Sequence, residues 1–239
     1  MPSEELTLPL FSRDGMTKFL KLYLYKMEPE ASVSFEDLDL HQSEVERFKK
    51  IKSSKKAREF LLSRFLLQKI LDSEFEISLQ CFRKDLEYPV LENTKIQISM
   101  SHSAEFFMFG FSDMKIGVDI ETKFPKLDAI ELAKKYFSTQ EQKLIESKTN
   151  QESQKKVFQC LWSLKESYYK YLGQEQSLEM VNELVFDLGQ SLDPVKENPR
   201  FYYQQARDYS FSFCMESEPL SSEILIMGEN VSLSALQSY

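Results

Sequence analysis

Apolar side chains recur along the chain with two different periods, and together these predict a mixture of strands and helices. Residues 17–26 partly alternate apolar and polar positions, which is the pattern of a half-buried strand. Two segments with helical spacing follow, at about 43–52 and 55–71. The second segment carries a regular set of apolar residues: Phe60, Leu61, Phe65, Leu66, Ile70 and Leu71.

The rest of the chain continues this mixture. Residues 127–148 have helical spacing, and Ser138 with Glu141 predicts a capping box that divides them into two helices. A longer helix is predicted at about 154–172, with Gly173 as its natural end. Further strands are predicted at 77–83, 95–101, 106–112, 115–121, 183–188, 200–206 and 209–216. Because the strands cluster instead of alternating strictly with helices, the predicted fold class is α+β.

Composition narrows the class of protein. The 239 residues suffice for one large domain or two small ones, and 42% apolar residues exclude a disordered or collagen-like chain. The longest apolar stretches are too short to cross a bilayer, and residues 1–5 show no start of a secretory signal. Cys81, Cys160 and Cys214 are far apart and odd in number, which predicts a reducing, cytoplasmic location.

The charge is unevenly distributed. A net charge of −8 argues against a general nucleic-acid-binding protein, which would usually be basic. One stretch nevertheless has the opposite sign and either attracts an anion or forms a solvated helix face. It contains seven basic residues and no acidic one: Arg47, Lys49, Lys50, Lys52, Lys55, Lys56 and Arg58.

Two carboxylates share one face of the predicted strand at 115–121. Asp119 and Glu121 are two residues apart, so both side chains leave the strand on the same side. Paired carboxylates repel one another unless a cation or a proton lies between them, and hard oxygen ligands of this kind suit Mg²⁺. The alternative is a solvent-facing acidic pair on an edge strand.

The predicted helix at 154–172 holds a second charged pair. Glu166 and Lys170 are four residues apart and therefore lie on one helical face, where they can pair. An ordinary surface ion pair is the simpler interpretation. Aromatic residues surround the pair, however, which predicts a partly buried helix in which retained charges mark a site: Phe158, Trp162, Tyr168, Tyr169 and Tyr171.

A histidine among hydroxyl residues ends the predicted strand at 95–101. His102, flanked by Ser101 and Ser103, is either a hydrogen-bonded structural group or a phosphate ligand. The sequence contains no G-x-S-x-G, no Walker A motif and no G-x-G-x-x-G, so a serine hydrolase and the usual nucleotide-binding loops find no support. His102 has only one other histidine in the chain, which disfavours zinc.

Taken in order, S-H-S, G-V-D-I-E and W-S-L-K-E-S-Y-Y-K resemble the motifs of the Sfp-type 4′-phosphopantetheinyl transferases. The family pattern is G-[IV]-D-[IVL]-E, followed some forty residues later by W-[ST]-x-K-E-[AS]-x-x-K. Residues 137–141 also resemble the family's F-[ST]-x-x-E segment, and Glu44, Glu46, Arg47 and the helix from Arg58 to Arg64 resemble its basic N-terminal half. The resemblance covers roughly residues 40–190.

The resemblance implies an enzyme that moves the 4′-phosphopantetheine arm of coenzyme A to a serine of an apo acyl or peptidyl carrier protein. Adenosine 3′,5′-bisphosphate is the implied second product. The implied fold has two similar α+β halves related by a pseudo-twofold axis, each a small, mostly antiparallel sheet with packed helices. Residues 1–115 would form the half that contacts the coenzyme A phosphates. Residues 116–239 would carry the Mg²⁺ site and the carrier contacts.

The resemblance also assigns residues. Asp119, Glu121 and Glu166 correspond to the Mg²⁺ ligands, and Glu166 and Lys170 to the catalytic residues. Glu166 would accept the proton of the carrier serine, with Glu141 as the alternative base. The implied contacts to coenzyme A come from six residues: Arg47, Arg83, Ser101, His102, Lys165 and Lys170.

One segment departs from the family pattern. Members usually carry G-[KR]-P before the histidine strand, whereas this chain has Leu86-Glu87-Tyr88-Pro89. The proline is kept, but the glycine and the cation that helps to hold coenzyme A are missing. Either Arg83 or Lys84 compensates, or the affinity for coenzyme A is reduced.

Two other functions remain open at this point. The chain could be a relative that binds carrier proteins without catalysis, or an unrelated Mg²⁺-dependent phosphotransferase acting on nucleotides or nucleic acid. For the transferase we expect a monomer, because one strand and one helix supply the metal ligands. We expect no nucleic-acid or membrane partner.

Overall fold

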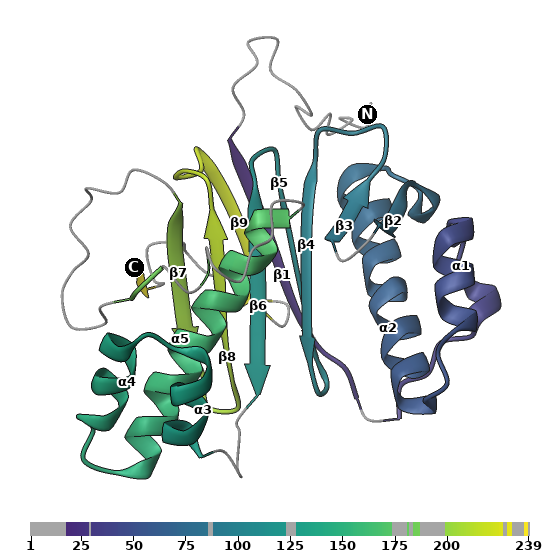
Figure 1. Ribbon diagram of the computed structural model, residues 1–239. Coiled ribbons are helices and arrows are strands. Elements are labelled where there is room, and N and C mark those ends of the chain that lie inside the picture. The colour runs from purple at the N-terminus through teal and green to yellow at the C-terminus, as the bar shows by residue number, and fades with distance from the viewer. Residues whose placement is uncertain are drawn as a thin grey trace.

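The protein contains two sheets whose central strands carry apolar side chains on both faces. The computed structural model describes residues 18–28, 30–85, 88–122, 128–173, 181, 184–186, 199–226, 229–230 and 237–238. The first sheet has five strands in the order β10-β9-β1-β5-β4 (Figure 1). Their bounds are β1 (Phe19–Lys26), β4 (Gln97–Ser103), β5 (Phe106–Ser112), β9 (Ser221–Ile226) and β10 (Glu229–Asn230).

The second sheet has four strands in the order β11-β7-β8-β6, with β6 at one edge. Its strands are β6 (Ile116–Thr122), β7 (Arg200–Gln205), β8 (Tyr209–Met215) and β11 (Gln237–Ser238). A separate two-stranded ribbon pairs β2 (Phe82–Asp85) with β3 (Tyr88–Leu91). The described strand pairs are antiparallel except for β1 with β9, which is parallel.

Helices cover the outer face of each sheet (Figure 1). Those on the first sheet are α1 (Gln42–Lys49) and α2 (Ser54–Ile70), and α2 continues into a π-helical turn at Leu71–Phe75. Those on the second sheet are α3 (Ala129–Tyr136), α4 (Thr139–Glu146) and α5 (Gln151–Leu172). Two short 3-10 turns complete the helices, at Phe35–Asp37 and Leu79–Cys81.

The apolar residues form three stacked cores. Along β1, Leu22 belongs to the core between the two sheets, while the next residue, Tyr23, belongs to the core under α2. On β8, Phe213 and Cys214 divide in the same way between the central core and the core under α5. The order of layers is therefore helix, sheet, sheet, helix. Along the core strands, successive side chains point alternately into the central core and into the core under the helices.

Gly117 lets α5 lie directly against β6. A Cβ atom at this position would be 1.9 Å from the carbonyl oxygen of Ser167 and 2.4 Å from the amide nitrogen of Tyr171. Both neighbours are helix backbone, which cannot turn away as a side chain can. The glycine that begins the G-V-D-I-E motif therefore sets the distance between β6 and α5.

Most of the predicted elements are confirmed, including the α+β class and the capping box at Ser138 and Glu141. The strand predicted at 77–83 is wrong: Ser78 caps a 3-10 turn with its side chain, and pairing begins only at Phe82. The last helix begins at Gln151, before the predicted 154, because the Asn150 side chain accepts a hydrogen bond from the amide of Ser153.

Strand β3 was not predicted, and the C-terminal part of the chain contains further differences. Of the strand predicted at 183–188, residues 184–186 have no regular secondary structure and the others lie outside the described residues. Strand β9 was not predicted, and it completes the first sheet next to β1. The division at residues 115 and 116 and the pseudo-twofold axis stay predictions. Within the described part of the chain, no helix is both long and apolar enough to span a membrane.

The close contact at Gly117 gives a stability prediction. Gly117→Ala should lower the free energy of unfolding by about 1–3 kcal/mol, the usual cost of overpacking, because the methyl group meets helix backbone. Gly110→Ala is the matched control, since its nearest neighbour is a side-chain atom, Cγ1 of Val118 at 2.6 Å, and not helix backbone. We expect a smaller loss there in urea unfolding. Equal stability of Gly117→Ala and the wild type would contradict this account.

Candidate functional site

The two sheets meet along a seam where serines of β4 face β6. Ser99 Oγ accepts a hydrogen bond from the Val118 amide at 3.0 Å, and Ser103 Oγ accepts one from the Thr122 amide at 3.1 Å. Strands β4 and β6 belong to different sheets and share no backbone ladder. The serine hydroxyls therefore satisfy backbone donors of β6 that a neighbouring strand would otherwise pair.

Asp119 lies in this seam and is almost fully buried. Its Oδ1 accepts hydrogen bonds from Lys170 Nζ at 2.7 Å and from Ser101 Oγ at 3.0 Å. Its Oδ2 is buried and has no hydrogen-bond partner among the described residues. A buried carboxylate oxygen without a donor is costly, so the site favours a further cation or donor at Oδ2.

Glu121 lies two residues further along the same face of β6. Trp162 Nε1 donates to its Oε1 at 3.0 Å, and Ser103 Oγ donates to its Oε2 at 3.4 Å. Burial, followed by the negative charge of Asp119, raises the pKa of Glu121 to about 7, although the bond from Trp162 acts in the opposite direction. This carboxyl group is therefore close to its titration point at neutral pH.

Glu166 completes the acidic cluster from α5. Burial raises the pKa of Glu166, repulsion by Asp119 adds to this, and attraction by Lys170 opposes it. None of the described residues forms a hydrogen bond or an ion pair with its carboxylate. The Glu166–Lys170 pair that the sequence allowed is replaced by the contact of Lys170 with Asp119. Among the described residues, Lys170 is the cation that attracts both Glu121 and Glu166, and it contacts Asp119 directly.

The donor set of this acidic cluster fits a divalent cation in kind. Asp119, Glu121 and Glu166 offer hard oxygen atoms, and the orphaned Asp119 Oδ2 lacks a positive partner. Within the described ranges, however, no three His, Cys, Asp or Glu side chains already lie in an arrangement that could hold a metal ion. Lys170 Nζ donates a hydrogen bond to Asp119 Oδ1 instead. Binding of a metal ion by these carboxylates therefore requires their side chains to rearrange.

His102 lies on the same strand as Ser101, and its side chain is half-exposed. Its Nε2 is 3.7 Å from Glu59 Oε2, and its ring stacks on Phe107 with 5.7 Å between the centroids. Desolvation lowers the pKa of His102, with Lys170 acting in the same direction and Glu59 opposing both. The ring is therefore largely neutral at pH 7 and can still donate a hydrogen bond.

Arg47 and Arg83 lie on the helical side of the first sheet, outside the acidic cluster. Arg47 Nη1 is 3.6 Å from Glu44 Oε1, and Arg83 Nε is 2.9 Å from Glu92 Oε1. Glu44 is itself buried and accepts a hydrogen bond from Arg64 Nε at 2.7 Å. Arg64 thus ties α1 to α2, a structural role that the sequence did not indicate. The neighbouring lysines of the basic stretch are exposed: Lys49, Lys50, Lys52, Lys55 and Lys56.

Lys165, one of the expected coenzyme A contacts, has its side chain in the interior of the protein. Only 5% of its side chain is exposed, and its Nζ is 3.2 Å from Glu141 Oε1. Glu141 is fully buried, and its side chain caps α4. Its carboxylate thus has a structural role in addition to the expectation that it could serve as the alternative base. The structure brings together Ser101, Asp119, Glu121, Glu166 and Lys170, and it places Lys165 and Glu141 behind them.

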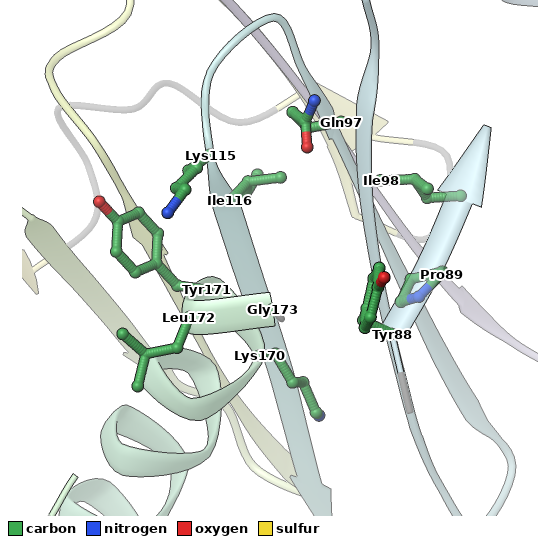
Figure 2. Close-up of a pocket in the computed structure, with 10 residues that line it drawn as sticks. All are labelled: Tyr88, Pro89, Gln97, Ile98, Lys115, Ile116, Lys170, Tyr171, Leu172 and Gly173. Atoms are coloured by element: carbon green, nitrogen blue, oxygen red, sulfur yellow. The ribbon is translucent and has the colours of Figure 1, made fainter. Parts of the chain in front are cut away.

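A cavity of about 240 Å³ opens beside Lys170 (Figure 2). Tyr88 and Pro89, from the segment that differs from the family pattern, lie on one side of the cavity, and Lys115 and Tyr171 lie on the other side. Leu86 and Glu87 lie outside the described residues. The cavity combines two ammonium groups with aromatic rings, a lining that suits an anionic ligand with an apolar or planar part. Its full lining is Tyr88, Pro89, Gln97, Ile98, Lys115, Ile116, Lys170, Tyr171, Leu172 and Gly173.

Several residues of the site escaped the sequence analysis. Trp162 was noted as an aromatic and as the first residue of the W-S-L-K-E-S-Y-Y-K motif, but its hydrogen bond to Glu121 was not predicted. The alternation Ser99, Ser101, Ser103 was a usable signal, because three hydroxyls on one face of a strand predict a polar contact on that face. Lys115 carried no signal at all, since nothing local distinguishes it from a solvated lysine.

Comparison with known proteins bears on the part of the chain that carries the acidic cluster. A family model described as the 4′-phosphopantetheinyl transferase superfamily matches residues 115–221. That range begins two residues before Gly117 and ends at the first residue of β9, so it includes Asp119, Glu166 and Lys170.

Curated relatives agree with this match. The chain is 28% identical to "4′-phosphopantetheinyl transferase Sfp" of Bacillus subtilis (strain 168), over 60% of this chain and 70% of that protein. It is 30% identical to "4′-phosphopantetheinyl transferase gsp" of Aneurinibacillus migulanus, over 59% of each. A third relative, "Putative 4′-phosphopantetheinyl transferase slr0495" of Synechocystis sp. (strain ATCC 27184 / PCC 6803 / Kazusa), is 27% identical over 56% of this chain and 57% of its own.

The chain thus spans 70% of the first relative and less than two thirds of the other two. The family match and the relatives point to the same proteins as the sequence motifs. Over residues 115–221 the chain is similar to the 4′-phosphopantetheinyl transferase superfamily, and the relatives that it resembles include Sfp-type members.

Proposed function

We propose that this protein transfers the 4′-phosphopantetheine arm of coenzyme A to a serine hydroxyl of an apo acyl or peptidyl carrier protein. The observation that carries the proposal is the acidic cluster of Asp119, Glu121 and Glu166, which faces Lys170 at the edge of a cation-lined cavity. Similarity of residues 115–221 to the 4′-phosphopantetheinyl transferase superfamily supports the same activity.

The reaction requires one bond to form and one to break. The serine oxygen attacks the phosphorus that carries pantetheine, and the pyrophosphate bridge to adenosine 3′,5′-bisphosphate breaks. The serine loses its proton, and the leaving phosphate takes the electron pair of the broken bond. Such a transfer depends mainly on positioning and on neutralising charge, and the protein need not supply a nucleophile.

Asp119, Glu121 and Glu166 would hold Mg²⁺, which neutralises pyrophosphate charge when it is bound. Lys170 lies between Asp119 and Ser101, with its Nζ 2.7 Å from an oxygen of each. Lys170 therefore stands at the boundary of the acidic cluster and the cavity, where it can bind a phosphate oxygen. Ser101 holds the ammonium in this place and would contact the same part of coenzyme A.

Glu166 is the proposed general base. Its raised pKa makes it a stronger proton acceptor than an ordinary carboxylate, and none of the described residues binds its oxygens. Glu141 is the weaker candidate, because its oxygens are buried within a cap and an ion pair. A proton of the carrier serine would therefore pass to Glu166.

The cavity beside Lys170 is the proposed place of the nucleotide end of coenzyme A. Lys115 offers a second cation, and Tyr88 stands where the family carries a basic residue. His102, Arg47 and Arg83 are the proposed further phosphate contacts. Arg83 is already paired with Glu92, so it would have to exchange partners on binding.

The remaining features of the proposal follow from this arrangement. Strand β6 and helix α5 supply all three proposed metal ligands, so no second subunit is needed to complete that site, and we propose a monomer. The halves 1–115 and 116–239, with coenzyme A between them, and a cytoplasmic location belong to the same proposal. We propose no nucleic-acid or membrane partner.

A non-catalytic carrier-binding relative is the second candidate, and the missing cation at Tyr88 is the observation that favours it. Mass spectrometry of an apo carrier protein with coenzyme A and Mg²⁺ separates the two functions. Gain of one phosphopantetheine group on the serine is expected. A carrier that binds the protein but never gains that mass would support the second candidate, and no change with any apo carrier of the source organism would refute the transferase.

The role of Glu166 gives the first prediction for the site. Glu166→Gln keeps the shape and one ligating oxygen but removes the basicity. We expect kcat to fall by roughly 10²–10⁴-fold even at saturating Mg²⁺, the usual worth of general base catalysis. Recovery of most of the rate by raised Mg²⁺ alone would show that Glu166 is only a ligand.

His102 should act in binding and not in the chemical step. Its proposed partner is a phosphate remote from the attacking serine, so its contact persists from ground state to transition state. Loss of such uniform binding raises KM for coenzyme A and leaves kcat nearly unchanged. Initial rates of His102→Ala across coenzyme A concentration measure both constants, and a collapse of kcat at constant KM would overturn this assignment.

Glu121 should make stability depend on pH when a chelator excludes divalent cations. The folded protein raises its pKa from 4.5 to about 7, so the protonated form is favoured by folding. Its contribution to stability is present below pH 4.5 and is lost as the pH rises through about 7. Glu121→Gln should therefore be more stable than the wild type at pH 8, with the advantage shrinking toward pH 4.5 in urea titrations. A constant difference across this range would contradict the raised pKa.

A further inference from the structure

Lys165 is next to Glu166 in the sequence, but its side chain is fully engaged inside the protein. Its Nζ donates to the carbonyl oxygens of Val181 at 3.0 Å and Leu184 at 2.7 Å. The third contact is the ion pair with Glu141 Oε1 at 3.2 Å. These three partners match the three N–H donors of an ammonium group, so the buried charge is satisfied without any ligand.

Glu141 extends the same connection to α4. Its Oε2 accepts the Ser138 amide at 3.0 Å, which closes the capping box at the start of the helix. Its Oε1 also accepts the Phe186 amide at 3.3 Å. A single buried pair therefore joins α5, the beginning of α4 and the segment around residues 181–186.

This connection fixes how α5 is rotated about its own axis. Successive residues of an α-helix differ by about 100° in direction, so an anchored Lys165 determines where Glu166 points. About half a turn before Lys165, a hydrogen bond between Ser163 Oγ and Ser212 Oγ, at 2.9 Å, fixes α5 to β8. Two residues after Lys165, the backbone of Ser167 lies directly against Gly117. Glu166 lies between these anchors.

Stability alone gives a weak reason for such a pair. Replacing a buried ion pair with apolar residues is often neutral or stabilising, whereas buried charges can specify one arrangement among several. Lys165 and Glu141 lie in the core under α5, beside Phe137, and their contacts reach the backbone on both sides of the pair. These contacts hold the two side chains in one arrangement, which suits a role in orientation.

We propose that Lys165 and Glu141 are positioning residues, which set the rotation of α5 and thereby aim the Glu166 carboxylate at the acidic cluster. The proposal rests on the transferase function and adds the residues that orient its base. It also replaces the coenzyme A contact expected for Lys165, since no N–H of its ammonium is left for a phosphate.

The first test is Lys165→Met, which keeps the length of the side chain and removes its charge. Displacement of a catalytic group by about 1 Å can cost up to about 10²-fold, so we expect kcat to fall by about 10–100-fold. Calorimetric affinity for coenzyme A should stay within about twofold, because Lys165 does not touch the cofactor.

The unliganded protein offers a readout that does not require activity. Trp162 is the only tryptophan in the chain, lies three residues before Lys165 and donates to Glu121. Rotation of α5 would break that bond, so Lys165→Met should shift the emission maximum of Trp162. The emission of Trp162 therefore reports a positioning defect even if the protein is not a transferase. Failure of the transferase proposal would be recognised separately, because the wild type would then lack the activity.

Stability is separated from positioning by a double variant. Lys165→Met leaves Glu141 buried without a partner, and adding Glu141→Gln removes that charge while keeping an acceptor for Ser138. The double variant should regain stability in urea unfolding but keep the low kcat and the shifted emission. Lys21→Met is the matched control: it breaks a partly buried pair with Glu74 at 2.7 Å on β1, and it should change stability alone.

Two results would overturn the proposal. Wild-type kcat and Trp162 emission in a stable double variant would make the pair purely structural. A tenfold or greater loss of coenzyme A affinity at unchanged kcat would make Lys165 a cofactor contact. If Lys165→Met does not fold, Glu141→Gln alone carries the same test, since it weakens the anchor but keeps both carbonyl bonds of Lys165.

Discussion

The close approach of α5 to β6 is the contact on which the proposed site depends. Gly117 has no side chain, so the backbone of α5 at Ser167 rests directly on the strand. This contact places Glu166 and Lys170 over the face of β6 that carries Asp119. A side chain at Gly117 would separate the two elements, and the carboxylates from strand and helix would no longer share one electrostatic environment.

Electrostatic imbalance is the main consequence of this contact. Asp119, Glu121 and Glu166 are held together in a partly desolvated seam with Lys170 bound to Asp119, and the pKa values of Glu121 and Glu166 are raised. A fold selected only for stability would avoid such a cluster. The excess negative charge is useful if a cation and a polyphosphate bind there together, because their charges offset it and each other.

The sequence predicted the parts of this arrangement that are encoded locally. Period-two alternation located β6, helical spacing located α5, and the placement of Asp119 and Glu166 followed from the two motifs. Contacts between distant segments were not predictable. The anchoring of Lys165 on Val181 and Leu184 depends on chain packing, and strand β9 pairs with β1 across about two hundred residues. Lys165 therefore resembled a phosphate ligand in the sequence and is an internal anchor in the structure.

The most direct test of the central claim, that the acidic cluster and Lys170 form one binding site for a metal and coenzyme A, is calorimetry of coenzyme A binding with and without Mg²⁺. The wild type should bind coenzyme A more tightly when Mg²⁺ is present, because a cation held by Asp119 would offset the charge of the pyrophosphate. Asp119→Asn should lose this dependence while remaining folded. Equal affinity of the wild type with Mg²⁺ and with excess chelator would contradict the account.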